Sequence, residues 1–225
     1  MTLSLTARSS DGALGIIISS SSPAVASRCV HLRAGVGASA SQNVTNPALG
    51  GAVLDALESG ATADAALEAA LAGDEFPDFR QLTAVDALGS VAVRSGARAL
   101  GVHGEHVGDS CVAAGNLLAG DGVLAAMVAG FESADGPFEE RLMAGLRAAA
   151  DAGGEAGELR SAGLAVVEGA SWRVTDLRVD DHDDPVGELE RLVRLWLPQK
   201  DAYLSRALRP DEAPSYGVPG DEADE

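Results

Sequence analysis

The order of strand-like and helix-like segments is the feature that most constrains the fold of this chain. Strand patterns lie at 2–8, 15–18, 29–33, 36–41, 79–85, 91–93, 111–118, 164–168 and 172–179. Helix patterns lie at 47–59, 63–72, 122–134, 137–152 and 185–197. Strand blocks separated by paired helices indicate an α+β protein with two stacked, mainly antiparallel sheets and helices on both outer faces. A parallel doubly wound sheet would alternate one strand with one helix, and periodicity alone leaves both architectures open.

Local signals set the boundaries of these elements. Apolar and polar residues alternate along 2–8, as in a half-buried strand, and Asp11-Gly12 is a turn signal that predicts a hairpin with 15–18. Asn46 is the expected N-cap of the first helix, with Pro47 in its first position.

The chain divides into one domain and a tail. A length of 225 residues is enough to bury a full core, and the structured patterns end near residue 197. Beyond Pro198 the sequence is polar, contains three more prolines and ends Asp-Glu-Ala-Asp-Glu. We therefore expect a domain at 1–197 and an acidic, mostly disordered tail at 198–225.

Charge and composition exclude several classes of function. Acidic residues outnumber basic residues by 34 to 16, and the net charge of -18 disfavours binding to nucleic acid and to anionic membranes. Cys29 and Cys111 cannot form a disulfide framework, and the first residues lack the pattern of a signal peptide, so we expect a cytoplasmic protein. Lys200 is the single lysine, which nearly excludes a catalytic lysine in the core.

Thr2 is the first candidate for chemistry. A threonine behind an initiator methionine is in a context from which the methionine is normally trimmed, and trimming would give Thr2 a free α-amine beside its hydroxyl. An α-amine has a pKa near 8, so it can take the hydroxyl proton at neutral pH and create an activated nucleophile without a histidine. Many proteins simply begin with Met-Thr, which is the non-catalytic explanation.

Residues 33–42 combine closely spaced glycines with polar side chains. Glycines let backbone N–H groups approach a ligand, and Arg33 can hold a carboxylate or orient a nucleophile. Two closely packed strands are the structural alternative. Ser41, Gln42 and Asn46 form a polar set before a helix N-terminus, where amide groups can donate to an oxyanion, although helix capping alone explains Asn46.

The run Asp180-Asp181-His182-Asp183-Asp184 has a composition suited to a metal site. Neighbouring strand positions face opposite sides, however, and the last aspartate of the run is a natural N-cap before Pro185. The sequence also contains no phosphate-binding loop. We therefore predict no metal and no cofactor, and metal-dependent hydrolysis at this run is a third alternative for function.

Six short motifs occur in an order that resembles a known family. They are Thr2–Arg8, Arg33–Ala38, Ser41-Gln42 before Asn46-Pro47, Phe79-Arg80-Gln81 before Val85-Asp86, Gly115–Leu118 and Leu177–His182. With them, the chain from Thr2 to about Leu197 resembles the domain-of-unknown-function family 1028, bacterial and archaeal proteins related to N-terminal nucleophile (Ntn) hydrolases. The resemblance implies the four-layer αββα sandwich of those hydrolases, in agreement with the element order.

The resemblance also implies that Thr2 is the nucleophile. Proteasome-type relatives place a lysine near the N-terminal threonine, and this chain has no lysine besides Lys200. Arg33 is the substitute that we expect, with an electrostatic role because arginine cannot act as a base. This departure favours a small-molecule amidohydrolase over a peptidase.

The sequence thus predicts hydrolysis of an amide-like C–N bond in a small molecule by a homo-oligomeric enzyme. The expected catalytic residues are Thr2, Arg33, Gln42 and Asn116, with Gln42 or Asn116 stabilising the oxyanion. The expected substrate-binding residues, some of them at the edge of the site or at a subunit contact, are Ser41, Asn46, Arg80, Asp180, Asp181 and His182. The missing lysine motivates the alternative, a non-catalytic Ntn-fold protein that uses the same cleft as a ligand pocket.

Overall fold

The computed structural model describes residues 2–221, and its centre is the hairpin predicted at the start of the chain. β1 (Thr2–Arg8) pairs antiparallel with β2 (Leu14–Ser20). Four more strands extend this pair into a six-stranded antiparallel sheet of order β10-β9-β2-β1-β8-β7. The added strands are β7 (Gly104–Gly108), β8 (Cys111–Asn116), β9 (Ser161–Val167) and β10 (Arg173–Val179).

A second antiparallel sheet has four strands in the order β3-β4-β5-β6. Its strands are β3 (Val30–Arg33), β4 (Gly37–Asn43), β5 (Arg80–Asp86) and β6 (Val91–Ser95). No pair within either sheet is parallel, so the doubly wound alternative is wrong and the α+β prediction with two antiparallel sheets is confirmed.

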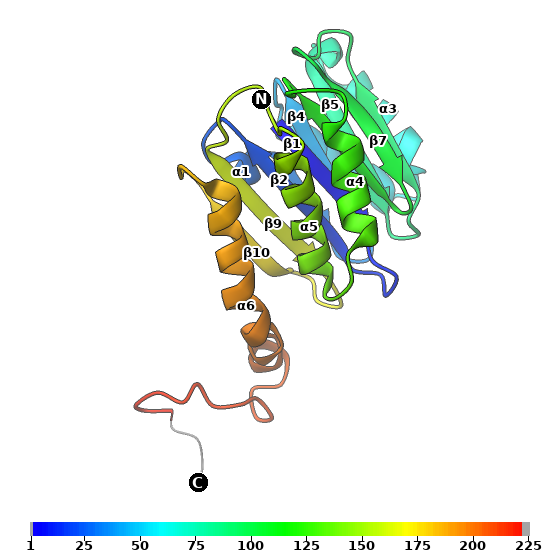
Figure 1. The fold of residues 1–225 in the computed structure, drawn as a ribbon. Helices are drawn as coiled ribbons and strands as arrows, with labels where there is room; N and C mark the ends of the chain where they lie inside the picture. The colour runs from blue at the N-terminus through cyan, green and yellow to red at the C-terminus, as the bar shows by residue number, and fades with distance from the viewer. Residues whose placement is uncertain (1, 222–225) are drawn as a thin grey trace.

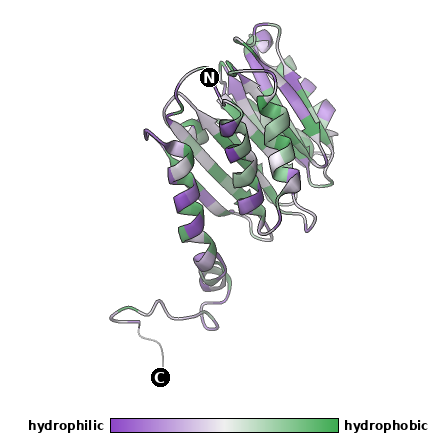
Figure 2. Cartoon of the chain, in the orientation of Figure 1, coloured by the Kyte–Doolittle hydropathy of each residue, from purple (hydrophilic) through white to green (hydrophobic). Residues whose placement is uncertain are grey.

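Helices cover the outer faces of the two sheets (Figure 1). α2 (Ala48–Glu58) and α3 (Ala63–Ala72) pack on the four-stranded sheet. α4 (Val123–Ser133), α5 (Phe138–Asp151) and α6 (Pro185–Leu208) pack on the six-stranded sheet. Figure 2 shows hydrophobic colour concentrated along the strands and hydrophilic colour along α6 and the outer side of α5. The layers are therefore helix, sheet, sheet and helix.

Alternation along β1 gives each face of that strand a different environment. Leu3 and Leu5 face α4 and α5 in the largest apolar cluster. Ser4 and Thr6 point the other way, into the space between the sheets, where they bond to side chains of β4 and β5. The rest of that space is filled by an apolar cluster that includes Ile16 and Ile18 of β2.

Several elements differ from the sequence prediction. A short helix, α1 (Val25–Cys29), precedes β3 in a segment for which no element was expected, apart from its last residue. β7 was missed, because it is an exposed edge strand that starts and ends at glycine. α6 runs to Leu208 through Pro198, so residues 198–208 are helical and not part of a disordered tail. Residues 209–221 are mainly turns and irregular backbone, and the last four residues of the expected tail lie outside the described residues.

The described helices include none with both the length and the apolar character needed to cross a bilayer.

Two adjacent glycines in α2 provide a test of helix-to-sheet packing. A Cβ built on Gly50 would lie 2.0 Å from Cδ2 of His31 on β3, whereas a Cβ on Gly51 meets nothing within 4 Å. We expect Gly50→Ala to lower the free energy of unfolding by about 1–3 kcal/mol through steric overlap. Gly51→Ala should raise it by up to about 1 kcal/mol, because alanine favours the helix.

Urea unfolding of both variants measures the difference. Equal stability of the two variants would contradict the close approach of α2 to β3.

Candidate functional site

The candidate site lies between the sheets, at the end where β1 begins. Thr2 is 5% exposed, and its neighbour in register on β8 is Asn116, which is fully buried. Directly paired residues of an antiparallel ladder share one face of the sheet, so both side chains point toward the four-stranded sheet. Ser4, two residues along the same face, donates from Oγ to Oε1 of Gln42 at 2.8 Å.

Gln81 of β5 is the centre of a buried hydrogen-bond network at this end. Its Oε1 accepts from Nε2 of Gln42 at 2.8 Å and from Nδ2 of Asn116 at 3.2 Å. Its Nε2 faces the carbonyl oxygens of Gly104 and Gly115 at 3.2 and 3.1 Å. The network therefore joins three strands of the two sheets, β4, β5 and β8, and ties β7 to them.

The two amides that donate to Gln81 have donor capacity left over. A side-chain amide nitrogen carries two hydrogens, and the Gln42 and Asn116 nitrogens each use one on Gln81. Both nitrogens lie within hydrogen-bond distance of one oxygen atom, so they are close to each other. The N–H groups that converge are used on Gln81, and the second hydrogen of each nitrogen is the donor that an oxyanion between the sheets could use.

Asn116 also carries an unsatisfied acceptor. Its Oδ1 is buried and has no hydrogen-bond donor among residues 2–221. A buried polar atom without a partner is destabilising by about 1–3 kcal/mol, and such atoms mark positions where a ligand or water supplies the missing bond. This oxygen belongs to the residue paired with Thr2, which places the unsatisfied acceptor at the expected nucleophile.

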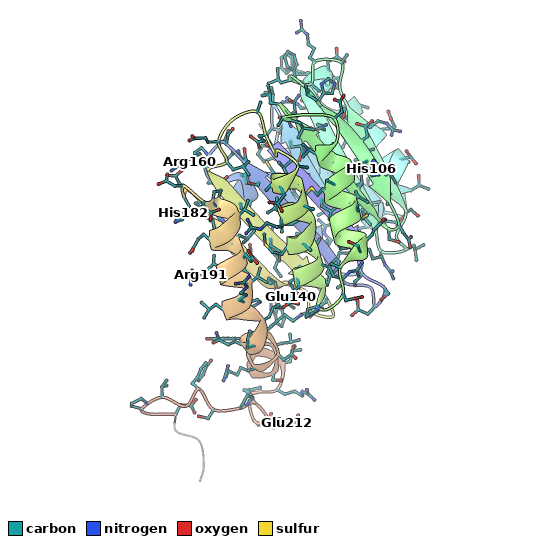
Figure 3. All side chains as sticks on the ribbon, in the orientation of Figure 1. His106, Glu140, Arg160, His182, Arg191 and Glu212 are labelled. Carbon is teal, nitrogen blue, oxygen red and sulfur yellow. The ribbon has the colours of Figure 1, made fainter. Side chains whose placement is uncertain are left out.

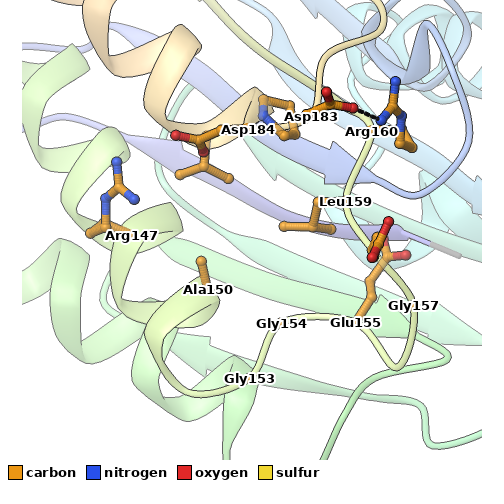
Figure 4. A pocket seen from close by; sticks show the side chains of 13 residues that line it. Arg147, Ala150, Gly153, Gly154, Glu155, Gly157, Leu159, Arg160, Asp183 and Asp184 are labelled. Atoms are coloured by element: carbon orange, nitrogen blue, oxygen red, sulfur yellow. Dashed lines mark hydrogen bonds and ion pairs between the residues drawn. The ribbon is translucent and has the colours of Figure 1, made fainter.

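A cavity lies apart from this network. About 590 Å³ in volume, it is bounded by α5, the segment 153–160 and the start of α6 (Figure 4). Its lining contains the buried Glu155 but not Thr2, Gln42 or Asn116. The polar network lies between the sheets and the cavity lies on the helix-covered side, so the two are distinct features that share one end of the molecule.

Arg33 is not brought to Thr2. It ends β3 opposite Gly37, at the far end of β4 from Gln42. Its guanidinium bonds to Asp55 at 2.8 Å and to Glu58 at 2.6 Å, both on α2. The expected electrostatic role at the nucleophile is therefore inconsistent with its position, and Arg33 ties β3 to a helix.

Ser41, Asn46 and Arg80 face away from the inter-sheet space and organise the segment that leads into α2. Ser41 Oγ donates to the backbone oxygen of Asn46 at 2.8 Å, and Asn46 Oδ1 accepts from the backbone of Ala48. Pro47, rather than Asn46, is the N-cap position of α2. Arg80 forms an ion pair with Asp74 and donates to the carbonyl of Val44. These contacts are structural, and they do not bring the three side chains to Thr2.

Asp180, Asp181 and His182 lie on the exposed rim after β10. Asp180 pairs with Arg178 at 2.8 Å, Asp181 pairs with Arg160 at 2.9 Å, and Nδ1 of His182 accepts from the backbone of Asp184. Figure 3 shows Arg160 and His182 together at the start of α6. Within the described chain, no group of three His, Cys, Asp or Glu side chains is placed to hold a metal ion.

A model of the family described as "Family of unknown function (DUF1028)" matches residues 2–189. The chain belongs to the DUF1028 family. Protein SPO2555 from Silicibacter pomeroyi, also described as DUF1028, has a similar crystal structure with a TM-score of 0.81 and 33% sequence identity. That match covers 86% of this chain and 88% of the other. No curated protein matches the chain.

Two buried residues of this DUF1028 protein were not assigned to the site from the sequence. Gln81 entered the prediction only as part of a family motif, although a glutamine on the inward face of a buried strand is a signal that it bonds to a buried partner. Glu155 lies in a glycine-rich segment between a helix pattern and a strand pattern, and this segment has no periodicity that predicts burial.

The role of Gln81 in the DUF1028 fold is testable by substitution. Gln81→Leu removes the shared acceptor and leaves the Gln42 and Asn116 nitrogens buried without it. We expect the free energy of unfolding to fall by about 2–4 kcal/mol, since each lost partner contributes about 1–3 kcal/mol.

Gln199→Leu on the exposed surface of α6 is the matched control and should change stability by less than about 0.5 kcal/mol. Urea unfolding distinguishes the two, and a small effect at position 81 would contradict the network.

The Asp74–Arg80 pair makes a pH-dependent prediction. The Arg80 side chain hydrogen-bonds to Asp74 and lowers the pKa of that carboxyl, although partial burial opposes the shift. The pair therefore stabilises the fold above the unfolded pKa of about 3.9 and loses its contribution as the pH falls through the lower folded value. Asp74→Asn should reduce stability by roughly 2 kcal/mol at pH 7.

The wild type and Asp74→Asn should converge in stability once the pH falls below the lowered pKa of Asp74 in the folded protein. Thermal unfolding across pH 2–7 measures this, and a difference that does not change with pH would contradict it.

Proposed function

We propose that this DUF1028 protein is an Ntn-type hydrolase that cleaves an amide-like C–N bond in a small molecule. The observation that carries the proposal is the position of Thr2, which is buried at the start of a central strand and paired with Asn116 of the polar network. The αββα layering described above also supports it, because that architecture is the one expected of an Ntn hydrolase.

The proposed reaction begins when removal of Met1 leaves Thr2 with a free α-amine. Oγ of Thr2 attacks the substrate carbonyl, and the α-amine accepts the hydroxyl proton. The oxyanion of the tetrahedral intermediate accepts hydrogen bonds from the remaining N–H groups of Gln42 and Asn116. The α-amine then gives its proton to the leaving nitrogen, and water releases the acyl group from Thr2.

The position of Lys200 supports a second candidate function. This lysine lies on α6 and bonds to Glu139 at 3.2 Å and Glu168 at 3.0 Å, at the opposite end of β9 from Ser161. No lysine therefore approaches Thr2, in contrast to proteasome-type enzymes. A non-catalytic ligand-binding protein with the same fold is the alternative, and it predicts binding without turnover.

Mass spectrometry of the intact protein tests the first step. We expect the mass of a chain that lacks Met1 and starts at Thr2. Retention of Met1 would eliminate the free-amine mechanism, because an amide nitrogen cannot accept the hydroxyl proton.

Substitution of Thr2 tests the chemistry on a panel of small amide substrates. We expect Thr2→Ala to reduce kcat/KM by about 10³-fold or more, since the nucleophile is lost, and Thr2→Ser to retain measurable turnover. Thr45→Ala, on the segment before α2, is the matched control and should keep wild-type activity. Equal background rates for wild type and Thr2→Ala, with a ligand that raises Tm in both, would favour the binding protein.

A further inference from the structure

Glu155 occupies the end of β1. β1 lies between β2 and β8, and its first residue in the sheet is Thr2. Oε2 of Glu155 accepts from the backbone N–H of Ser21, the residue after β2, at 3.1 Å. The backbone of Glu155 also forms a bridge with Leu118, two residues beyond β8. Glu155 therefore spans the gap between the two strands that flank β1, at the end where the chain enters at Thr2.

The segment that carries Glu155 is fixed in this position by its neighbours. The backbone N–H of Ala119 donates to the carbonyl of Gly154 at 3.0 Å, and that of Ala156 donates to the carbonyl of Leu117 at 2.9 Å. Gly154 has a φ of +61°, which lets the chain turn sharply just before Glu155. The main chain on both sides of Glu155 is thus bonded to the segment after β8, which fixes the position of the residue.

The Glu155 carboxyl is buried and only partly satisfied. The residue is 5% exposed, and its Oε1 is buried without a hydrogen-bond donor in the described part of the chain. Burial raises the pKa of Glu155 to about 7, against the Ser21 N–H, which lowers it. A buried carboxyl with one unsatisfied oxygen is the environment in which a cation gains most from ionic contact.

The arginines that line the adjacent cavity form ion pairs with residues other than Glu155. Arg147 of α5 pairs with Glu190 at 2.5 Å. Arg160 pairs with Asp181 and Asp183. The remaining carboxyls of the lining are Glu158, which is exposed, and Asp184, which caps α6 through Gly187. The arginines that line the cavity therefore do not neutralise Glu155.

We propose that Glu155 is a positioning residue that forms an ion pair with the α-ammonium of Thr2 when Thr2 is the first residue of the chain. The inference rests on the proposed function, because it requires the free amine of that mechanism. It also extends the site from the polar network between the sheets to the segment 153–160.

The ion pair holds the α-amine of Thr2 in one orientation during the reaction. One proton moves from Oγ of Thr2 to the neutral α-amine, and the resulting ammonium is stabilised by the ionised Glu155. The same proton then passes from the ammonium to the leaving nitrogen of the substrate, which breaks the C–N bond. Glu155 remains a carboxylate throughout and acts only through the amine.

The pKa of the Thr2 amine is the quantity that tests this pair. The protein is prepared with Thr2 first, by cleavage of an N-terminal fusion, so that the result does not depend on native removal of Met1. Reductive ¹³C-methylation gives two sets of NMR signals, since Lys200 is the only lysine. Glu155→Gln should lower the pKa of the α-amine by about one unit or more, because the nearby negative charge is lost.

Glu158→Gln is the matched control, because it removes an exposed carboxyl from the same segment. It should leave the amine pKa unchanged, and Glu155→Asp should give a value between those of wild type and Glu155→Gln. Equal amine pKa values in wild type and Glu155→Gln would overturn the proposal, as would equal shifts in the two glutamine variants.

If Glu155→Gln fails to fold, a reciprocal measurement on the wild-type chain still tests the ion pair. Acetylation of the Thr2 amine removes its charge, so the pKa of Glu155, followed by ¹³C NMR of labelled glutamate, should rise relative to the unacetylated protein. An unchanged Glu155 pKa would overturn the proposal.

Activity measurements distinguish a failure of the Glu155 ion pair from a failure of the proposed hydrolase function. If the enzyme is active, Glu155→Gln should move the acid limb of the kcat/KM profile to lower pH, following the amine. Turnover with no coupling between Glu155 and the amine refutes only the ion pair. Coupling without turnover on any amide refutes only the hydrolase.

Discussion

The structure depends on the requirement that buried amide groups between two sheets find partners. An unpaired amide in that space is destabilising, so Gln42, Gln81 and Asn116 can be buried only if their strands meet in one relative position. Apolar packing alone tolerates a shift of one sheet over the other, but a shared acceptor does not. The network therefore fixes how β1 and β8 lie over β4 and β5, and it makes one end of the sandwich polar.

Ion pairs on the outer side connect helices to the edges of the four-stranded sheet. Arg33 of β3 bonds to α2, and Arg94 of β6 bonds to Asp64 and Glu68 on α3. These carboxylates are largely exposed, so each pair contributes no more than about 1 kcal/mol. Arginine suits such contacts because its planar fork reaches two carboxylates at once, and fifteen of the sixteen basic residues are arginine. The arginines described here thus form ion pairs outside the candidate site, on the surface and, at Arg80, in a largely buried pair with Asp74.

Strong periodicity made the elements predictable, whereas the site depends on contacts between distant segments. The alternation in β1 and the paired helix patterns gave the two sheets and their covering helices. Arg33 was misplaced because sequence spacing does not show which end of β4 faces Thr2; only the register with β5 and the contact of Ser4 with Gln42 do. Glu155 was missed because its burial arises from contacts with Ser21 and Leu118, which lie far from it in the sequence.

The pairing of β1 with β8 also determines when Thr2 becomes buried during synthesis of the chain. Thr2 aligns with Asn116, so the ladder that buries it cannot close until more than a hundred further residues have been made. At ribosomal speeds of about 5–20 residues per second, this takes roughly 6–23 s. During that interval the start of β1 is open to enzymes that act on nascent chains. Burial of the candidate nucleophile therefore follows its exposure to processing, and a chain trimmed late would have to be trimmed against a closed sheet.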